Sequence, residues 1–317
     1  MQPRRMKPPP IFTLTGNLLW EKTFTFTDWS PGRTQRAAAE SFQVGGKGIN
    51  VVKMLARFGV PARALCFPGG ATGADCLAWM RAKKIPCQAF PVATPTRTGT
   101  VVRGGRHGET TFLGCDAPPD APALRACAHF LGAQPSGAAL ALCGSFPGWD
   151  SAAASPLRAA FGHWLARGGF LAADTYGPPL AWMVRRPVPL VKVNRVEFDG
   201  LFSSPQRRTA VAVRLRRACE RWPVKAWIVT DGPRPVWLAE KNSGRPIALK
   251  PPPVREISPT GSGDVLLAGV LHAWLHCGAT LAEAVAFALP YASANAARPD
   301  VAEFPLNNLP SSLSDID

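Results

Sequence analysis

The sequence predicts an α/β protein in which helices cover a mainly parallel central sheet and a small β-sheet forms a lid beside it. Strand-like apolar runs alternate with helical patterns along most of the 317 residues, and this alternation is typical of parallel sheets. Ranges 11–44 and 96–114 are instead rich in Thr, Val and Phe with alternating polarity, which is typical of strands half exposed to water. Two glycine-rich turns each precede a helical pattern, as in sites that bind phosphate.

The predicted elements follow one another in a regular order. After the first lid range, apolar residues recur at helical spacing from Val51 to Phe58, and Gly59 can end that helix. The later strand and helix segments are 61–70 and 74–84, 138–146 and 156–168, 170–175, 189–194, 224–232, and a helix after Asp264. Ligands gather at the carboxyl ends of parallel strands. We therefore expect a site among the residues that follow these strands: Gly69–Gly70, Gly144–Ser145, Asp174, Asn194 and Thr230–Gly232.

The composition favours one compact domain over residues 1–317. Hydrophobic residues make up 46% of the chain and charged residues 18%, which excludes a disordered protein. Lys and Arg number 36 against 21 Asp and Glu, so the formal charge of +15 attracts anions such as nucleotides, sugar phosphates or nucleic acid. The basic residues form no long tract, so a solvated basic surface is favoured over a nucleic-acid-binding module, which stays a distant alternative.

The eight cysteines form no C-x-x-C pair and have no histidine nearby at metal-ligand spacing, which argues against zinc and against a redox dithiol. They are expected to be reduced, as in a cytoplasmic protein. The basic start of the chain lacks the apolar run of a signal peptide, and the longest apolar stretch, 265–274, is too short for a membrane span. A cytoplasmic location with no membrane contact is therefore expected.

The turn at 257–264 suggests phosphoryl transfer. Gly261, Ser262 and Gly263 let the backbone turn tightly before a helix and aim free N–H groups at one point, where an anion can bind. Asp264 places a carboxylate beside that anion, as needed to take a proton from an alcohol. The alternative interpretation is an ordinary loop with a helix cap. A second glycine-rich turn, Gly45 to Asn50, opens the helix that follows it and strengthens the phosphate interpretation.

These motifs together resemble the PfkB or ribokinase-like family of carbohydrate kinases, from about residue 11 to about residue 300. Gly45 to Asn50 is similar to the family's early G-G-x-G-x-N signature, and Thr260 to Asp264 is similar to its late T-G-x-G-D signature. Between them, 144–148 resembles G-S-L-P-P-G, 192–197 resembles K-P-N-x-x-E, and 229–232 resembles V-T-x-G. The resemblance implies a three-layer ribokinase-like fold with a β-sheet lid.

The resemblance also implies phosphoryl transfer from ATP to a sugar hydroxyl. Asp264 would be the base, and Gly261, Ser262 and Gly263 would stabilise the moving phosphoryl group. Asn194 and Glu197 would hold Mg²⁺, directly or through water, although their spacing also fits a simple helix cap. A monovalent cation is a further ligand to consider. The residues implied near ATP are Asn194, Thr230, Gly232, Thr260, Gly261 and Gly263.

The acceptor is expected to be a hexose phosphate, most simply fructose 1-phosphate. Asn17 and Glu21 are similar to the T-x-N-P-x-x-D opening of 1-phosphofructokinase and tagatose-6-phosphate kinase relatives, with Glu in place of Asp and without the Pro. Arg33 and Arg36 resemble their G-E-V-N-R element, and Arg97 resembles their T-R; arginine suits a phosphate because its guanidinium donates two parallel hydrogen bonds. The implied substrate-binding residues are Asn17, Glu21, Arg33, Arg36, Gly45, Gly46, Lys47, Asn50 and Arg97.

Three alternatives stay open at this point. Residues 97–100 and 109–112 are also close to the pattern of free-sugar kinases, so a free-sugar or nucleoside kinase of the same family is the first. A non-catalytic sugar or nucleotide sensor is the second, although an intact Asp264 argues against it. The third is that two subunits pair through the lid, which is compatible with either kinase. Residues 18–29 suggest it, since they are rich in aromatic residues that suit a buried face.

Overall fold

A nine-stranded sheet forms the centre of the computed structural model, which describes residues 10–105, 108–243, 245–307 and 309. Its strand order is β13-β12-β11-β10-β9-β8-β1-β4-β5. The strands from β11 to β5 run parallel, and only β12 and β13 join the edge antiparallel. Its strands are β1 (Ile11–Thr15), β4 (Ala62–Cys66), β5 (Cys87–Ala89), β8 (Ala139–Cys143), β9 (Phe170–Asp174), β10 (Leu190–Asn194), β11 (Ala226–Asp231), β12 (Arg234–Glu240) and β13 (Ile247–Leu249).

Helices cover both faces of this sheet, as the alternating sequence pattern predicts. They are α1 (Lys47–Arg57), α2 (Gly70–Ala82), α3 (Ala121–Gly132), α4 (Ser155–Ala166), α5 (Pro178–Met183), α6 (Arg195–Asp199), α7 (Ser204–Arg207), α8 (Val211–Arg221), α9 (Ser262–Leu271) and α10 (Leu281–Ala296), with the short helices η2 (Ala152–Ala154) and η3 (His272–His276). Every residue of β8 is buried. Its leucines belong to the core cluster that includes residues of α3, α4 and α8, and its small residues belong to the cluster that includes residues of α1, α9 and α10, because successive side chains in a strand point to opposite faces.

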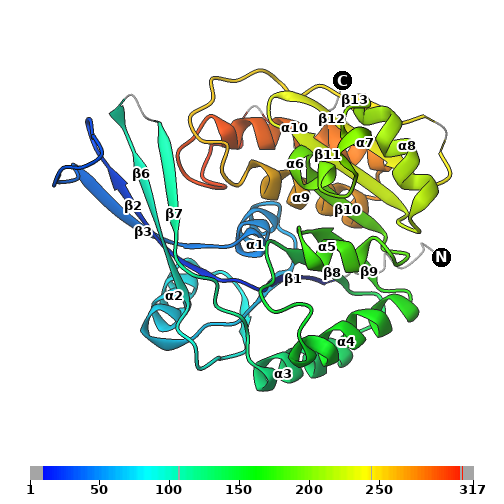
Figure 1. Cartoon of the computed structure of the whole chain (residues 1–317), viewed down its shortest axis with the longest axis horizontal. Coiled ribbons are helices and arrows are strands. Elements are labelled where there is room, and N and C mark those ends of the chain that lie inside the picture. Colours follow the sequence, from blue (N-terminus) through cyan, green and yellow to red (C-terminus); the bar gives the residue numbers. More distant parts are fainter. Residues whose placement is uncertain (1–9, 106–107, 244, 308, 310–317) are drawn as a thin grey trace, which may run out of the picture.

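A separate four-stranded sheet, called the lid below, projects from one end of the body (Figure 1). Its order is β3-β2-β6-β7, with β2 (Leu19–Thr25), β3 (Ala39–Gly45), β6 (Arg97–Arg103) and β7 (Glu109–Leu113). The predicted α/β fold with a small β-sheet is thus confirmed. One detail differs: Ile11–Thr15, predicted as part of the lid, is β1 in the centre of the large sheet. All five of its residues are buried, which a strand half exposed to water does not allow.

None of the helices that the structure describes is long and apolar enough to cross a membrane.

Candidate active site

A cavity of about 1090 Å³ lies where the carboxyl ends of the central strands meet the base of the lid. The body contributes residues that follow the strands, including Ser145 after β8 and Asn194 at the end of β10. The lid contributes Glu21, Gln43 and Arg97, from β2, β3 and β6. This is the edge of a parallel sheet where ligands bind. The residues implied by the family resemblance all line the cavity except Arg33, Arg36 and Glu197. Of the residues expected at strand ends, Gly69, Gly70, Asp174 and Asp231 do not line it.

The glycine-rich turn Gly261–Gly263 begins helix α9 at this cavity. Gly261 precedes the helix with φ of 76°, a left-handed conformation that favours glycine. A Cβ atom at Gly261 would lie 2.3 Å from the side chain of Val301, so the turn packs directly on the loop that follows α10. Among the described residues, no backbone partner accepts a hydrogen bond from the N–H of Gly261 or Gly263. Free N–H groups at a helix N-terminus form an anion-binding site.

Asp264 lies in the first turn of α9 and is 4% exposed. Asn50, from α1, donates a hydrogen bond from Nδ2 to Asp264 Oδ2 at 2.8 Å, which brings the two signature motifs together. Burial and then the negative charge of Asp174 raise the pKa of Asp264 to about 6, against the opposing charges of Lys47 and Lys192. A carboxyl with this pKa is ionised at neutral pH and suits a general base.

Two lysines meet one buried carboxylate beneath the turn. Lys47 Nζ lies 2.8 Å from Asp174 Oδ1, and Lys192 Nζ lies 2.8 Å from Asp174 Oδ2. Burial would raise the pKa of Asp174, but the two lysines outweigh it and lower that pKa. The same carboxylate, with Glu197 and Asp264, raises the pKa of Lys47 despite burial. The lowered pKa of Asp174 and the raised pKa of Lys47 therefore keep this pair charged at neutral pH, with the Lys47 ammonium beside the anion site.

Asn194 and Glu197, the predicted Mg²⁺ residues, form a capping box at the start of α6. Asn194 Oδ1 accepts from Glu197 N–H at 2.9 Å, and Glu197 Oε2 accepts from Asn194 N–H at 2.8 Å. Glu197 Oε1 lies 3.3 Å from Lys47 Nζ. No cluster of three or more His, Cys, Asp or Glu in the described chain could hold a metal ion. One carboxylate near nucleotide phosphates still fits Mg²⁺, which keeps several waters and takes ligands from the phosphates.

The far half of the cavity suits a nucleotide. Thr230 in β11 and Gly232 just after it, both implied near ATP by the resemblance, line the cavity. The segment Pro251–Val254 also lines the cavity, as does Tyr176, which is 47% exposed. An apolar wall with an aromatic ring suits a planar base, since bases bind by stacking and by apolar contact. The sequence patterns did not identify Tyr176 or the proline segment, because neither belongs to a motif or repeats at a regular spacing.

The near half of the cavity carries polar groups that suit an acceptor. Asn17 Nδ2 donates to Asp116 Oδ1 at 2.7 Å and to Ser145 Oγ at 3.0 Å, and Arg97 Nη1 lies 3.1 Å from the same Asp116 oxygen. Glu21 accepts a hydrogen bond from Gln43, and burial raises its pKa. Asp116 was not predicted, since it stands in a loop outside every motif.

Arg33 and Arg36, predicted to hold an acceptor phosphate, lie away from the cavity within this chain. Both are exposed in the connection between β2 and β3, and neither lines the cavity. Arg97 is therefore the predicted acceptor arginine that the fold brings to the site.

The backbone carbonyls beside the anion-binding turn already have side-chain partners. Thr260 O accepts from Asn295 Nδ2 at 2.9 Å, Pro299 O from Arg103 Nη2 at 2.5 Å, and Val301 O from Lys53 Nζ at 2.7 Å. Carbonyl oxygens are the ligands that a monovalent cation needs. The positive charges of Arg103 and Lys53, at two of these three oxygens, oppose the binding of such an ion there.

Comparison with known proteins gives the same family as the sequence motifs. Residues 19–307 match the family described as pfkB family carbohydrate kinase. The chain is 25% identical over 298 residues to 1-phosphofructokinase of Borreliella burgdorferi, covering 93% of this chain and 94% of that protein. It is 28% identical over 291 residues to ATP-dependent 6-phosphofructokinase isozyme 2 of Escherichia coli K12, covering 90% and 91%.

A solved structure supports the fold. The crystal structure of phosphofructokinase-2 from Escherichia coli in complex with potassium matches with a TM-score of 0.83 and 23% identity over 97% of each chain. At this identity the likeness shows the fold alone. The family match covers most of the chain, and the chain therefore belongs to the pfkB family of carbohydrate kinases.

Proposed function

We propose that this protein transfers the γ-phosphoryl group of ATP to a hydroxyl of a sugar phosphate, with a fructose phosphate as the acceptor. One observation carries the proposal: Asp264 is buried at the N-terminus of α9, in one cavity with Arg97 and beside two N–H groups, those of Gly261 and Gly263, for which the described chain holds no backbone partner. The names of two relatives, 1-phosphofructokinase and ATP-dependent 6-phosphofructokinase isozyme 2, support this donor and acceptor.

The chemistry follows from the positions of the charges. The acceptor hydroxyl binds against Asp264, which takes its proton as the oxygen attacks the γ-phosphorus and the bond from that phosphorus to ADP breaks, so that ADP leaves. The N–H groups of Gly261 and Gly263 donate hydrogen bonds to the phosphoryl oxygens as charge builds on them. Lys47 adds a positive charge beside them.

Mg²⁺, when bound, neutralises charge on the nucleotide phosphates, and Glu197 with Asn194 would hold it through water. The exposure of Asn194 leaves room for those waters. We expect no need for a monovalent cation, because the carbonyls beside the turn are bonded to Arg103, Lys53 and Asn295.

The acceptor phosphate would bind Arg97, whose guanidinium suits bidentate recognition of phosphate. The bond from Arg97 to Asp116 would then give way to the phosphate. A second candidate, a free-sugar kinase, is favoured by one observation: Asp116 and Asn17 offer hydrogen-bond partners for sugar hydroxyls where Arg97 is already paired.

An ATP-coupled screen of free and phosphorylated sugars tests the proposal. The wild type is compared with Arg97→Ala and with Arg81→Ala, an exposed arginine of α2 outside the cavity. We expect turnover on a fructose phosphate, a KM for it that rises about 10- to 100-fold in Arg97→Ala by loss of charge-assisted hydrogen bonds, and no change in Arg81→Ala. Faster turnover on a free sugar that Arg97→Ala does not affect would favour the second candidate.

We also propose that two copies pair through the lid. Phe112 and Leu113, on the edge strand β7, are 57% and 56% exposed, and exposed apolar side chains on an edge strand suit a partner. Light scattering of the wild type and of Phe112→Ser tests this, since the proposal expects a dimer in the first and a monomer in the second.

A further inference from the structure

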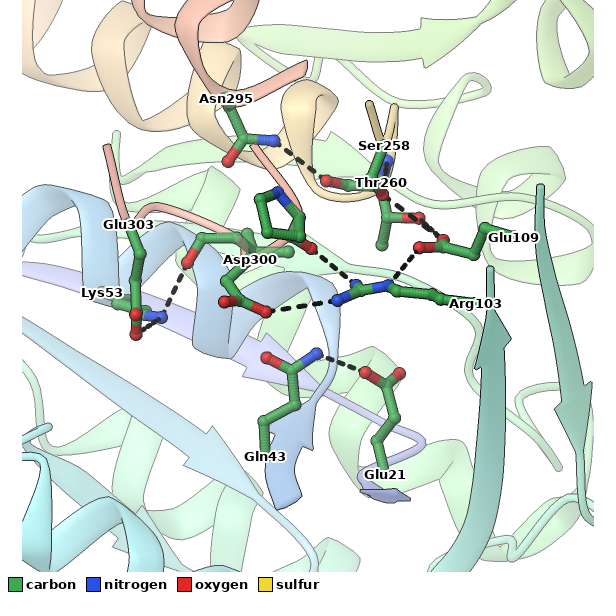
Figure 2. Close-up of polar contacts among 12 residues, drawn as sticks. Glu21, Gln43, Lys53, Arg103, Glu109, Ser258, Thr260, Asn295, Asp300 and Glu303 are labelled. Atoms are coloured by element: carbon green, nitrogen blue, oxygen red, sulfur yellow. Dashed lines mark hydrogen bonds and ion pairs between the residues drawn. The ribbon is translucent and has the colours of Figure 1, made fainter. Parts of the chain in front are cut away.

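The tip of the lid touches the body at a point far along the lid from its base. Arg103, the last residue of β6, and Glu109, the first residue of β7, face each other in the lid and form an ion pair with Arg103 Nε 2.7 Å from Glu109 Oε2. Both side chains are mostly covered, with 17% and 16% exposed. Figure 2 shows the pair reaching toward the loops that carry Thr260 and Asp300.

Glu109 contacts the strand-to-helix segment just before the anion-binding turn. Its Oε1 atom accepts a hydrogen bond from Thr260 Oγ1 at 3.0 Å and lies 3.3 Å from Ser258 Oγ (Figure 2). Thr260 directly precedes Gly261, the left-handed residue that begins the turn. A displacement of Thr260 therefore displaces the N–H groups of the turn.

Arg103 contacts the second loop that supports the turn. Its Nη2 atom donates to Pro299 O at 2.5 Å, and its Nη1 atom lies 3.4 Å from Asp300 Oδ1. Val301, the next residue, packs against Gly261. The ion pair of the lid thus contacts both segments that support the turn: Thr260, which precedes it in the chain, and the loop 299–301, which packs against Gly261.

The two loops form one unit on the body side. Asn295, which is 1% exposed, donates from Nδ2 to Thr260 O at 2.9 Å and to Ser262 Oγ at 3.0 Å, and its Oδ1 accepts from Ala302 N–H at 2.8 Å. The pair Arg103–Glu109 is the part of this network that the lid supplies.

We propose that Arg103 and Glu109 are positioning residues that hold the anion-binding turn of α9 in its phosphoryl-stabilising geometry when the lid lies over the cavity. The inference rests on the proposed function, since it concerns the turn that would stabilise the transferring group. Neither residue lines the cavity, so neither touches the substrate. Each acts through Thr260 or the 299–301 loop. Loss of the pair should therefore lower kcat while substrate binding at the lid base persists.

Hydrogen exchange at the turn tests this directly and needs no turnover. The amides of residues 257–264 are followed in the wild type, Arg103→Met, Glu109→Gln and Lys22→Met. Lys22 is the matched control, because it pairs with Glu40 within the lid at 3.0 Å and leaves the body untouched. We expect faster exchange at 257–264 in Arg103→Met and in Glu109→Gln, and the wild-type exchange rate in Lys22→Met. Equal protection of β8 and β10 in all four proteins would show that each is folded.

Kinetics supply the second arm. We expect kcat to fall about tenfold in Arg103→Met and Glu109→Gln, with the KM for the acceptor unchanged, and Arg103→Lys to recover part of the loss because it keeps the charge. The inference would be overturned if Arg103→Met and Glu109→Gln showed the wild-type exchange rate at 257–264, or if their kcat equalled that of Lys22→Met. If the wild type itself phosphorylates no sugar, the proposed function fails. The hydrogen-exchange measurement then still shows whether Arg103 and Glu109 hold the turn.

Discussion

The pH dependence of turnover depends on the environment of Asp264. Burial and the charge of Asp174 raise its pKa to about 6, and an acid with a raised pKa is protonated, and inactive as a base, below that value. The activity should therefore be full near neutral pH and fall as pH drops through about 6. One unit lower, only about one-tenth of Asp264 is ionised, so kcat/KM should be about tenfold below its plateau.

Two substitutions should shift the pH at which activity falls, called the acid limb below, in opposite directions. Lys192→Met removes a positive charge that opposes the raised pKa, while Lys47 still pairs with Asp174 at 2.8 Å, so the limb should move to higher pH. Asp174→Asn removes the negative charge that raises the pKa and takes from Lys192 its carboxylate partner, while Lys47 keeps Glu197, so the acid limb should move to lower pH. Each shift should be about one pH unit, the usual effect of a single charge nearby.

The assay is ATP-coupled turnover of the three proteins from about pH 4.5 to 9, with circular dichroism at each pH to confirm folding. The nucleotide's own phosphate titrates near pH 6, but equally for all three proteins, so the differences between profiles report on the protein. Coinciding limbs, or shifts in the same direction, would refute the electrostatic reasoning.

Two further substitution and ligand tests concern the turn and its support. Gly261→Ala should lower the free energy of unfolding by at least about 1–2 kcal/mol, because φ is 76° and the added Cβ would meet Val301 at 2.3 Å. The control is Gly162→Ala, in α4 with open space around it, which should raise that free energy by about 0.5–1 kcal/mol. Urea denaturation measures both variants, and equal effects on the free energy of unfolding would contradict the packing argument. Replacing K⁺ by tetramethylammonium at constant ionic strength should leave kcat unchanged, because Arg103 and Lys53 already bind the carbonyls beside the turn; a large loss would show that an ion competes for them.

The fold and the turn of α9 could be predicted because both depend on local pattern. Alternating strand and helix signals indicate a parallel sheet, and Gly261 and Gly263 before an apolar helix indicate a helix N-terminus that binds an anion. The family resemblance implied Asn50 only as a substrate-binding residue, and its contact with Asp264 at 2.8 Å comes from the structure. The error at Ile11–Thr15 arose because Thr alternates with apolar residues there even though both faces are buried.

The electrostatics of the site could not be predicted in the same way, because they depend on residues far apart in the chain. Asp174 is the last residue of β9, and Lys192 lies within the neighbouring strand β10. Only the folded sheet brings both side chains together with Lys47. Arg103 and Glu109 belong to the lid, and nothing in their spacing indicates Pro299 or Thr260 as partners. Exposure, too, is a property of the fold, so Arg33 and Arg36 could not be separated from Arg97 by sequence.

Asp264→Asn is the most direct test of the central claim that Asp264 is the base for phosphoryl transfer. The substitution keeps the side chain's size and removes its basicity. We expect kcat with ATP and the fructose phosphate acceptor to fall about 10²- to 10⁴-fold, while calorimetry shows nucleotide binding close to the wild type. Unchanged turnover in a folded Asp264→Asn protein would contradict the claim.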